Sequence, residues 1–259
     1  ENNGLGYSGT NSGGSLYIIS SVFKNNKGGL APNTLDSELL PPERETFIIG
    51  NLIENNNNLD APATQATNLS LGNGVVIAGG NNNIIKNNVI ANHNLYGVII
   101  TATADVNYWP AHGNRVESNL IINSKRADIA SSGLSNLGNC FENNYFNTSI
   151  PPGLQTLNNC DSSFYPLSAD LSGMWSSLAR VIQTSNGNYN QGDWRTFEAP
   201  ANQPNMPIMD ELMSLGYDKT SLPVTKIWSS VKPAVEVFSQ YEDVLEVIEL
   251  PEEARNYLN

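Results

Sequence analysis

A group of charged residues in the middle of the chain has the composition of an elimination site. Lys125, Arg126 and Asp128 lie together, with Arg115 a few residues upstream. An enzyme that cleaves uronate polymers by elimination needs a cationic base, and acids that hold calcium beside the substrate carboxylate. No acidic triplet with the spacing of a calcium loop accompanies these residues. The pattern therefore favours an ordinary ion pair on a solvated turn over a catalytic base.

Hydrolysis of a glycosidic bond would instead need two carboxyl groups facing each other across the substrate. Glu54 follows an apolar pair, whereas Glu117 precedes an asparagine by two positions, so the two do not share a column of the repeat described below. The sequence predicts surface acids, and no catalytic residue is assigned. The other acids of the repeated region are equally scattered: Asp60, Asp105, Asp128 and Glu142.

Tyr108, Trp109 and His112 are the best candidates for contact with a ligand. Aromatic rings can stack on the apolar faces of sugars, although a loop that packs its own aromatic residues would show the same pattern. His93 and His112 have no Cys or acidic companions at metal-ligand spacing, so no zinc site is predicted. No cofactor is expected, and calcium is the one ion left open.

The two cysteines, Cys140 and Cys160, flank a short stretch that contains Pro151-Pro152-Gly153. Cysteines this close in a loop-rich region predict a disulfide and an oxidising compartment, the alternative being two unrelated thiols. We therefore expect a secreted or cell-surface protein, or a periplasmic one. The chain does not begin with Met, which suggests a processed protein or a fragment. No stretch is long and apolar enough to predict a membrane span.

A repeat positions these residues. Its pattern is an asparagine, two apolar residues, a variable residue and a second asparagine. Repeats with periods of about 20 to 50 residues indicate solenoids or arrays. The first position of the pattern is occupied by Ser21, Asn51, Asn88, Asn119 and Asn144, spaced 30, 37, 31 and 25 residues apart.

The apolar runs of the repeat are short, β-branched and bounded by Gly or Asn, which predicts strands. Strands of successive repeats can pair in register, and stacked asparagine amides can hydrogen-bond above and below. We therefore predict a structural ladder of two columns, Asn51, Asn88 and Asn119 in the first, and Asn55, Asn92 and Asn123 in the second.

Residues 14 to about 148 resemble the right-handed parallel β-helix repeat of pectate-lyase-like proteins. A closer similarity, to exported bacterial β-helix proteins of unknown activity, rests on Asn33-Thr34-Leu35-Asp36 with Pro41-Pro42, on Gly79-Gly80 with Asn83, and on the stretch at 203–207. The resemblance implies an all-β, right-handed parallel β-helix solenoid but specifies no activity. Three inserts interrupt it, at 32–46, 60–71 and 102–113, and inserts of solenoids often form a binding face.

Composition divides the chain near Cys160. Residues 1–159 hold 31 of the 38 asparagines, so they are predicted to form the β-helix. Residues 160–259 are predicted to be an irregular, partly helical C-terminal extension. The extension carries Met174, Trp175, Trp194 and other large apolar residues, so we expect it to lie ordered against a surface, as a cap or an assembly tail.

A formal net charge of −12 argues against nucleic acid as a partner. A polysaccharide or a partner subunit remains compatible with this charge. We expect an extracellular, non-catalytic protein with a structural or binding role, either on its own or as a subunit of a larger assembly. The alternative is a polysaccharide lyase or glycoside hydrolase with part of its site outside this chain. Whether the protein is an enzyme stays open, and the sequence leans against it.

Overall fold

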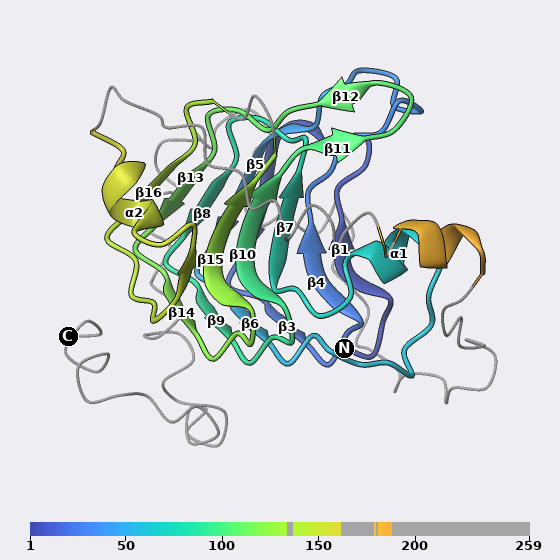
Figure 1. Cartoon of the computed structure of the whole chain (residues 1–259), viewed down its shortest axis with the longest axis horizontal. Coiled ribbons are helices and arrows are strands. Elements are labelled where there is room, and N and C mark those ends of the chain that lie inside the picture. Colours follow the sequence, from blue (N-terminus) through green and yellow to red (C-terminus); the bar gives the residue numbers. More distant parts are fainter. Residues whose placement is uncertain (134–136, 162–178, 180, 188–259) are drawn as a thin grey trace, which may run out of the picture. The chain divides into compact units, whose positions relative to one another are not determined.

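The computed structural model describes residues 1–133, 137–161, 179 and 181–187. Its secondary-structure elements are mostly β-strands, with few helices. The strands lie parallel in three stacked sheets, here called A, B and C (Figure 1). The prediction of parallel strands in stacked sheets is therefore confirmed, and the arrangement fits a solenoid.

Each sheet collects strands that lie far apart in the sequence. Sheet A contains β1 (Leu5–Ser8), β4 (Gly28–Ala31), β7 (Val75–Ala78), β10 (Tyr96–Thr101), β15 (Ala127–Ser132) and β17 (Ser149–Ile150). Sheet B contains β2 (Gly13–Ile19), β5 (Arg44–Ile49), β8 (Ile84–Lys86), β13 (Arg115–Glu117) and β16 (Cys140–Glu142). Sheet C contains β3 (Val22–Lys24), β6 (Leu52–Glu54), β9 (Val89–Ala91) and β14 (Leu120–Ile122).

The chain visits the sheets in a fixed order, from B through C to A, before the next repeat begins. The two apolar residues of the repeat and the variable residue after them form the strands of sheet C. Register is kept along this sheet: Ile53 of β6 pairs with Phe23 on one side and Ile90 on the other. The first four repeats therefore each add one strand to every sheet, whereas in sheet C the last contributes only a bridge from Tyr145 to Leu120.

The core lies between the three sheets. In the short strands of sheet B the middle residue points inward, and Ile85, Val116 and Phe141 have no exposed surface. The middle residues of sheet C, Ile53, Ile90 and Ile121, pack into the same cluster. Burial of such side chains stabilises the stack by about 2 kcal/mol each. A thin column of β-branched residues is therefore enough for a core in a chain of modest hydrophobic content.

The inserts add the remaining elements. Insert 1 (residues 32–46) runs into β5. Insert 2 (residues 60–71) forms the short helix α1 (Gln65–Leu69), whose N-terminus is capped by the Thr64 side chain. Insert 3 (residues 102–113) forms an antiparallel hairpin of β11 (Thr103–Ala104) and β12 (Tyr108–Trp109). A second helix, α2 (Leu154–Leu157), packs against β16 after the last strand.

Most of the C-terminal extension lies outside the described residues, and so does the prediction that it forms a cap or an assembly tail. Residues 181–185 are helical. The Thr184 hydroxyl, which is buried, accepts a hydrogen bond from the Asn68 side-chain amide at 3.0 Å. This part of the extension therefore contacts insert 2.

Candidate functional site

The first ladder runs along the turn between sheets B and C. The side-chain oxygen of Asn88 accepts hydrogen bonds from the backbone and side-chain amides of Asn51, at 2.8 and 3.0 Å. The Asn88 amide in turn donates to Asn119 and to the Ile48 carbonyl, both at 2.9 Å. Each side-chain amide therefore links neighbouring repeats. The buried polar groups of the ladder are hydrogen-bonded, as such groups usually are in folded proteins.

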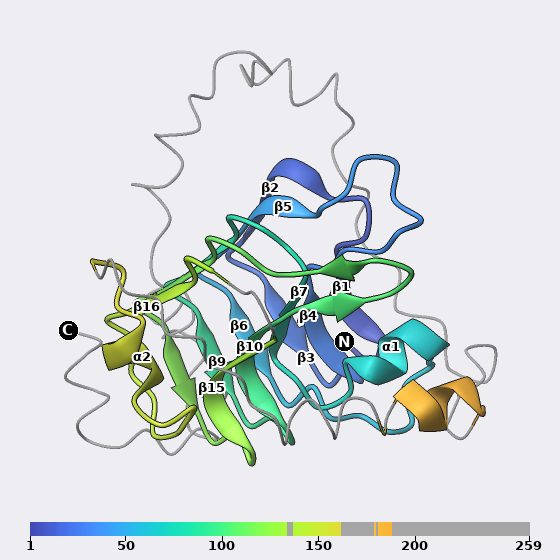
Figure 2. The same cartoon turned by 45° about the horizontal axis from the view of Figure 1, so that its top comes forward.

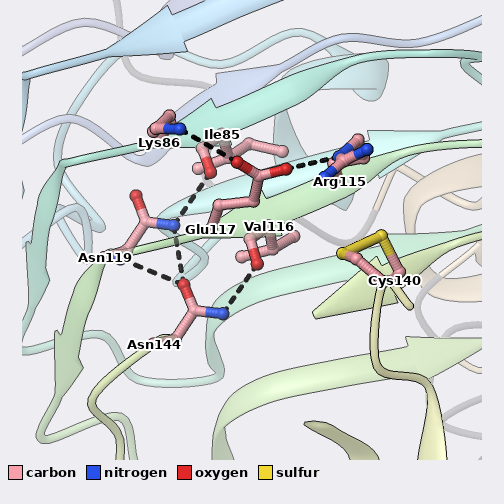
Figure 3. A network of polar contacts seen from close by, with 9 residues as sticks. Ile85, Lys86, Arg115, Val116, Glu117, Asn119, Cys140 and Asn144 are labelled. Carbon is pink, nitrogen blue, oxygen red and sulfur yellow. Dashed lines mark hydrogen bonds and ion pairs between the residues drawn. A yellow bond between two sulfur atoms is a disulfide. The ribbon is translucent and has the colours of Figure 1, made fainter. Parts of the chain in front are cut away.

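The ladder ends on a glutamine. Asn144, the last asparagine, donates from its backbone and side chain to Gln155 of α2, both at 2.9 Å (Figure 3 shows Asn119 and Asn144). Gln155 therefore takes the place that the next asparagine would have, and α2 closes this end of the stack.

Replacing Gln155 with alanine should lower the free energy of unfolding by about 1 kcal/mol, because two amides of Asn144 lose their acceptor at a partly solvated end. Chemical unfolding of the wild type and the variant measures the difference. The same change at Thr156, the next residue of α2, serves as the control. If the two variants lose equal stability, Gln155 does not terminate the ladder.

A second ladder, not predicted from the sequence, lies before the strands of sheet B. It contains Asn83, Asn114 and Asn139, and all three side chains are buried. Asn83 accepts a hydrogen bond from the Thr46 backbone at 2.7 Å and donates to the carboxyl group of Glu43 at 2.9 Å. The side chain of Glu43, which is fully buried, therefore ends this ladder on the side of insert 1.

The second predicted column differs from the prediction by one residue. Asn55, Asn92 and Asn123 have positive φ angles of 51°, 62° and 59°. Asn tolerates this left-handed conformation better than other non-glycine residues. Their side chains are partly or fully exposed, with one hydrogen bond between Asn123 and Asn92 at 3.2 Å. They therefore form a column of turn residues and not a buried ladder.

The buried column at this corner starts one residue later, with Asn26 and Asn56. The Asn56 side-chain oxygen accepts from both amides of Asn26, at 3.1 and 2.9 Å, and its amide donates to the Phe23 carbonyl. His93 follows in this column. Its Nε2 lies 3.3 Å from the Ile53 carbonyl, which can only accept, so Nε2 carries the proton. His93 therefore takes a ladder position at this corner.

Two residues of the group with the composition of an elimination site, Asp128 and Arg126, make contacts within the fold. Asp128 is buried and accepts hydrogen bonds from the backbone amides of Ser124, Asn147 and Thr148 at 2.9, 2.9 and 3.1 Å. Arg126 donates to the Tyr96 hydroxyl and lies over its ring, 5.7 Å from the centroid. Asp128 thus organises the last turn of the stack, and Arg126 packs on the outside of sheet A.

A second charged group lies on sheet B. Glu117 forms ion pairs with Lys86, at 3.1 Å, and with Arg115 (Figure 3). Burial acts to raise the pKa of Glu117, but the hydrogen bonds from these two cations lower it overall. Glu142, in register beside Glu117, completes an acidic pair. Since Lys86 and Arg115 already neutralise Glu117, this donor set does not fit calcium. Calcium binding elsewhere stays a prediction.

Cys140 and Cys160 form a disulfide, in which their Cα atoms lie 4.8 Å apart. It joins β16 to the segment after α2. The sulfur of Cys160 lies near Glu117 and Glu142, but a disulfide sulfur is a poor metal ligand. None of the described helices has the length and apolar character needed to cross a membrane. The disulfide is compatible with an extracellular protein.

Inserts 1 and 3 meet at one edge of the stack, as both views show (Figures 1 and 2). Asp36 joins them. Its carboxylate accepts hydrogen bonds from the backbone amide of Asn107, at 2.8 Å, and from the Asn107 side chain, and these hydrogen bonds lower the pKa of Asp36. Its own backbone amide donates to Asp105 at 3.0 Å. The hairpin of insert 3 is therefore fixed against insert 1.

The three ligand-binding candidates lie on or just after this hairpin, but in different environments. Tyr108 is 47% exposed, whereas Trp109 is partly buried over Gly79. His112 accepts a hydrogen bond from the Leu137 backbone through Nδ1 at 3.1 Å, so it positions its loop. Of the three predicted residues, Tyr108 is the most exposed.

Other apolar side chains of the joined inserts are more exposed still. Leu39 and Leu40 of insert 1 are 92% and 75% exposed, and Val106 at the hairpin tip is 87% exposed. A cleft of about 360 Å³ lies beside insert 1, lined by Asn11, Gly13, Ser37, Leu39 and Leu40. The sequence did not single out these leucines, because isolated apolar residues in a loop carry no periodic signal.

Comparisons with known proteins find no match: no family model, no curated protein and no solved structure is similar to the chain. Any function must therefore be argued from the geometry of the chain itself.

Proposed function

We propose that the chain is a right-handed parallel β-helix protein of the pectate-lyase-like kind. In this proposal it is exported to the cell surface, where it binds a neutral polysaccharide without cleaving it. The observation that carries the proposal is the joined surface of inserts 1 and 3. Asp36 fixes it in place, and Tyr108 exposes its ring there. A preorganised aromatic platform loses little conformational entropy when a sugar stacks on it.

Charge and chemistry support this ligand class. The net charge of −12 disfavours anionic polymers, whereas a neutral glycan meets no such repulsion. The charged residues best suited to catalysis are engaged elsewhere: Asp128 in turn formation, Arg126 with Tyr96, and Glu117 with Lys86 and Arg115. Binding therefore needs fewer assumptions than cleavage.

Tyr108→Ala should weaken binding to a neutral polysaccharide by about fivefold, because one ring stacking on a sugar contributes roughly 1 kcal/mol. Affinity electrophoresis against a panel of neutral and uronate polysaccharides identifies the ligand, and isothermal titration measures the affinity. Tyr108→Phe keeps the ring and should bind like the wild type.

Two results would contradict the proposal. One is the same affinity in the wild type and Tyr108→Ala. The other is release of reducing or unsaturated ends from any polysaccharide of the panel, which would make the protein an enzyme.

A further inference from the structure

A buried carboxyl group lies where insert 1 joins the second ladder. Glu43 has no exposed surface. Its Oε1 lies 2.6 Å from the Thr46 hydroxyl, and its Oε2 accepts a hydrogen bond from the Asn83 side chain at 2.9 Å. Any side chain at position 80 would collide with Oε2, so Gly80 provides the space for the carboxyl group.

No cation forms an ion pair with Glu43 in the part of the chain that the structure describes. Arg44, the adjacent residue, donates from Nη1 to the carbonyls of Leu40 and Pro42, at 3.2 and 3.1 Å. A second buried acid, Glu38, lies in the same insert and its electrostatic effect opposes ionisation of Glu43. The positive charge of Arg44 favours ionisation of Glu43, but burial, the largest effect, outweighs it. Tyr7 of β1 is also coupled to Glu43. A buried carboxylate without a bonded cation is costly, whereas a protonated carboxyl group is not.

The hydrogen bonds around Glu43 suit the protonated form. A protonated carboxyl group can donate through Oε1 to the Thr46 hydroxyl while its other oxygen accepts from Asn83. Consistent with this geometry, burial raises the pKa of Glu43 to about 7, against the opposing hydrogen bonds of Thr46 and Asn83.

We infer that insert 1 is a pH-responsive segment, held on the second ladder by the protonated side chain of Glu43 and loosened when this group ionises. The backbone amide of Glu43 donates to the Thr34 hydroxyl at 3.0 Å, and Thr34 in turn donates to the Gly79 carbonyl at 2.7 Å. Movement of Glu43 therefore disturbs both ends of the insert, and with it Asp36, which holds insert 3. The joined surface is firm in mildly acidic surroundings and looser above neutral pH.

The direction of the effect follows from proton linkage. The folded protein holds the Glu43 proton more tightly than the unfolded chain does, so the stabilisation is full below the unfolded pKa of about 4.5. It is lost as pH rises toward about 7 and stays lost above that value.

Hydrogen–deuterium exchange of the full chain, read on peptides that cover residues 32–46, tests the inference without any ligand. After correction for intrinsic exchange rates, protection should fall by at least about tenfold between pH 5.5 and pH 8.5. Peptides over residues 115–122 provide the internal reference and should not change. Because no ligand is present, the outcome does not depend on the proposed polysaccharide.

Glu43→Gln provides the matched variant. Its amide can donate to Thr46 and accept from Asn83, as the protonated acid does, so protection should stay high at both pH values. Glu45→Gln changes an exposed glutamate two residues away and should behave like the wild type. Constant protection of 32–46 in the wild type, or an unchanged pH response in Glu43→Gln, would overturn the inference.

Discussion

Replacing Asn88 with alanine is expected to lower the free energy of unfolding by about 3 kcal/mol. The change removes the acceptor of both Asn51 amides and the donor to the Ile48 carbonyl, all of them buried between repeats. Each buried polar group left without a partner costs roughly 1–3 kcal/mol, and the costs are not fully additive. Denaturant unfolding at constant pH measures the loss.

Asn92 provides a matched control. It is an asparagine of the same repeat, but its role is to adopt the left-handed backbone conformation of the turn and not to bond within the buried ladder. Its φ angle is 62°, which glycine adopts without strain. Asn92→Gly should therefore change stability by less than about 1 kcal/mol, whereas Asn88→Gly should be at least as damaging as Asn88→Ala. Similar losses at the two positions would mean that the ladder and the turn column are not distinct.

The expectation for Asn144 changes with the structure. From the sequence it is the last asparagine of its column, and a smaller effect than at Asn88 would be expected there. Gln155 continues the hydrogen bonds beyond Asn144, and the side-chain amide of Asn144 donates to the Val116 carbonyl at 2.7 Å. Asn144→Ala should therefore cost nearly as much as Asn88→Ala.

The repeat and its strands could be predicted because the same physical requirement recurs in each coil. An apolar pair enters sheet C, and an asparagine precedes it to bond the next coil. The second column could not be assigned, since adjacent asparagines such as Asn55 and Asn56 look alike in the sequence. His93 and Ser124 then occupy the later positions, which removes the asparagine signal altogether.

The joined inserts were beyond prediction for a different reason. Asp36 contacts Asn107 across 71 residues, through loops that have no period. Glu43, in contrast, has a recognisable position in the sequence. It lies three residues before Thr46, which bonds to the ladder residue Asn83. Gly80 and Ala111 lie three residues before Asn83 and Asn114, and their carbonyls accept the ladder amides of Asn114 and Asn139. An acid at that position marks the place where a side chain replaces a carbonyl.

The second large effect is a loss of stability at acidic pH, which we expect His93 to cause. His93 is buried, and burial lowers its pKa to about 4, although the hydrogen bond to the Ile53 carbonyl opposes the shift. The folded protein therefore resists protonation of His93 more than the unfolded chain does. Its contribution to stability is full above pH 6.5 and is lost as pH falls toward 4. We expect about 2 kcal/mol to be lost between pH 6.5 and pH 5.

Glu43 acts in the opposite direction over part of this range, so the measurement is best made in the Glu43→Gln background. His93→Asn restores the residue type of the ladder, and its amide can donate to the Ile53 carbonyl as Asn56 donates to Phe23. Unfolding of Glu43→Gln at several pH values, with and without His93→Asn, isolates the histidine. If both proteins lose the same stability between pH 6.5 and pH 5, His93 is not the acid-sensitive position of the ladder. A loss confined to the protein that retains His93 would assign the loss of stability between pH 6.5 and pH 5 to this one residue of the ladder.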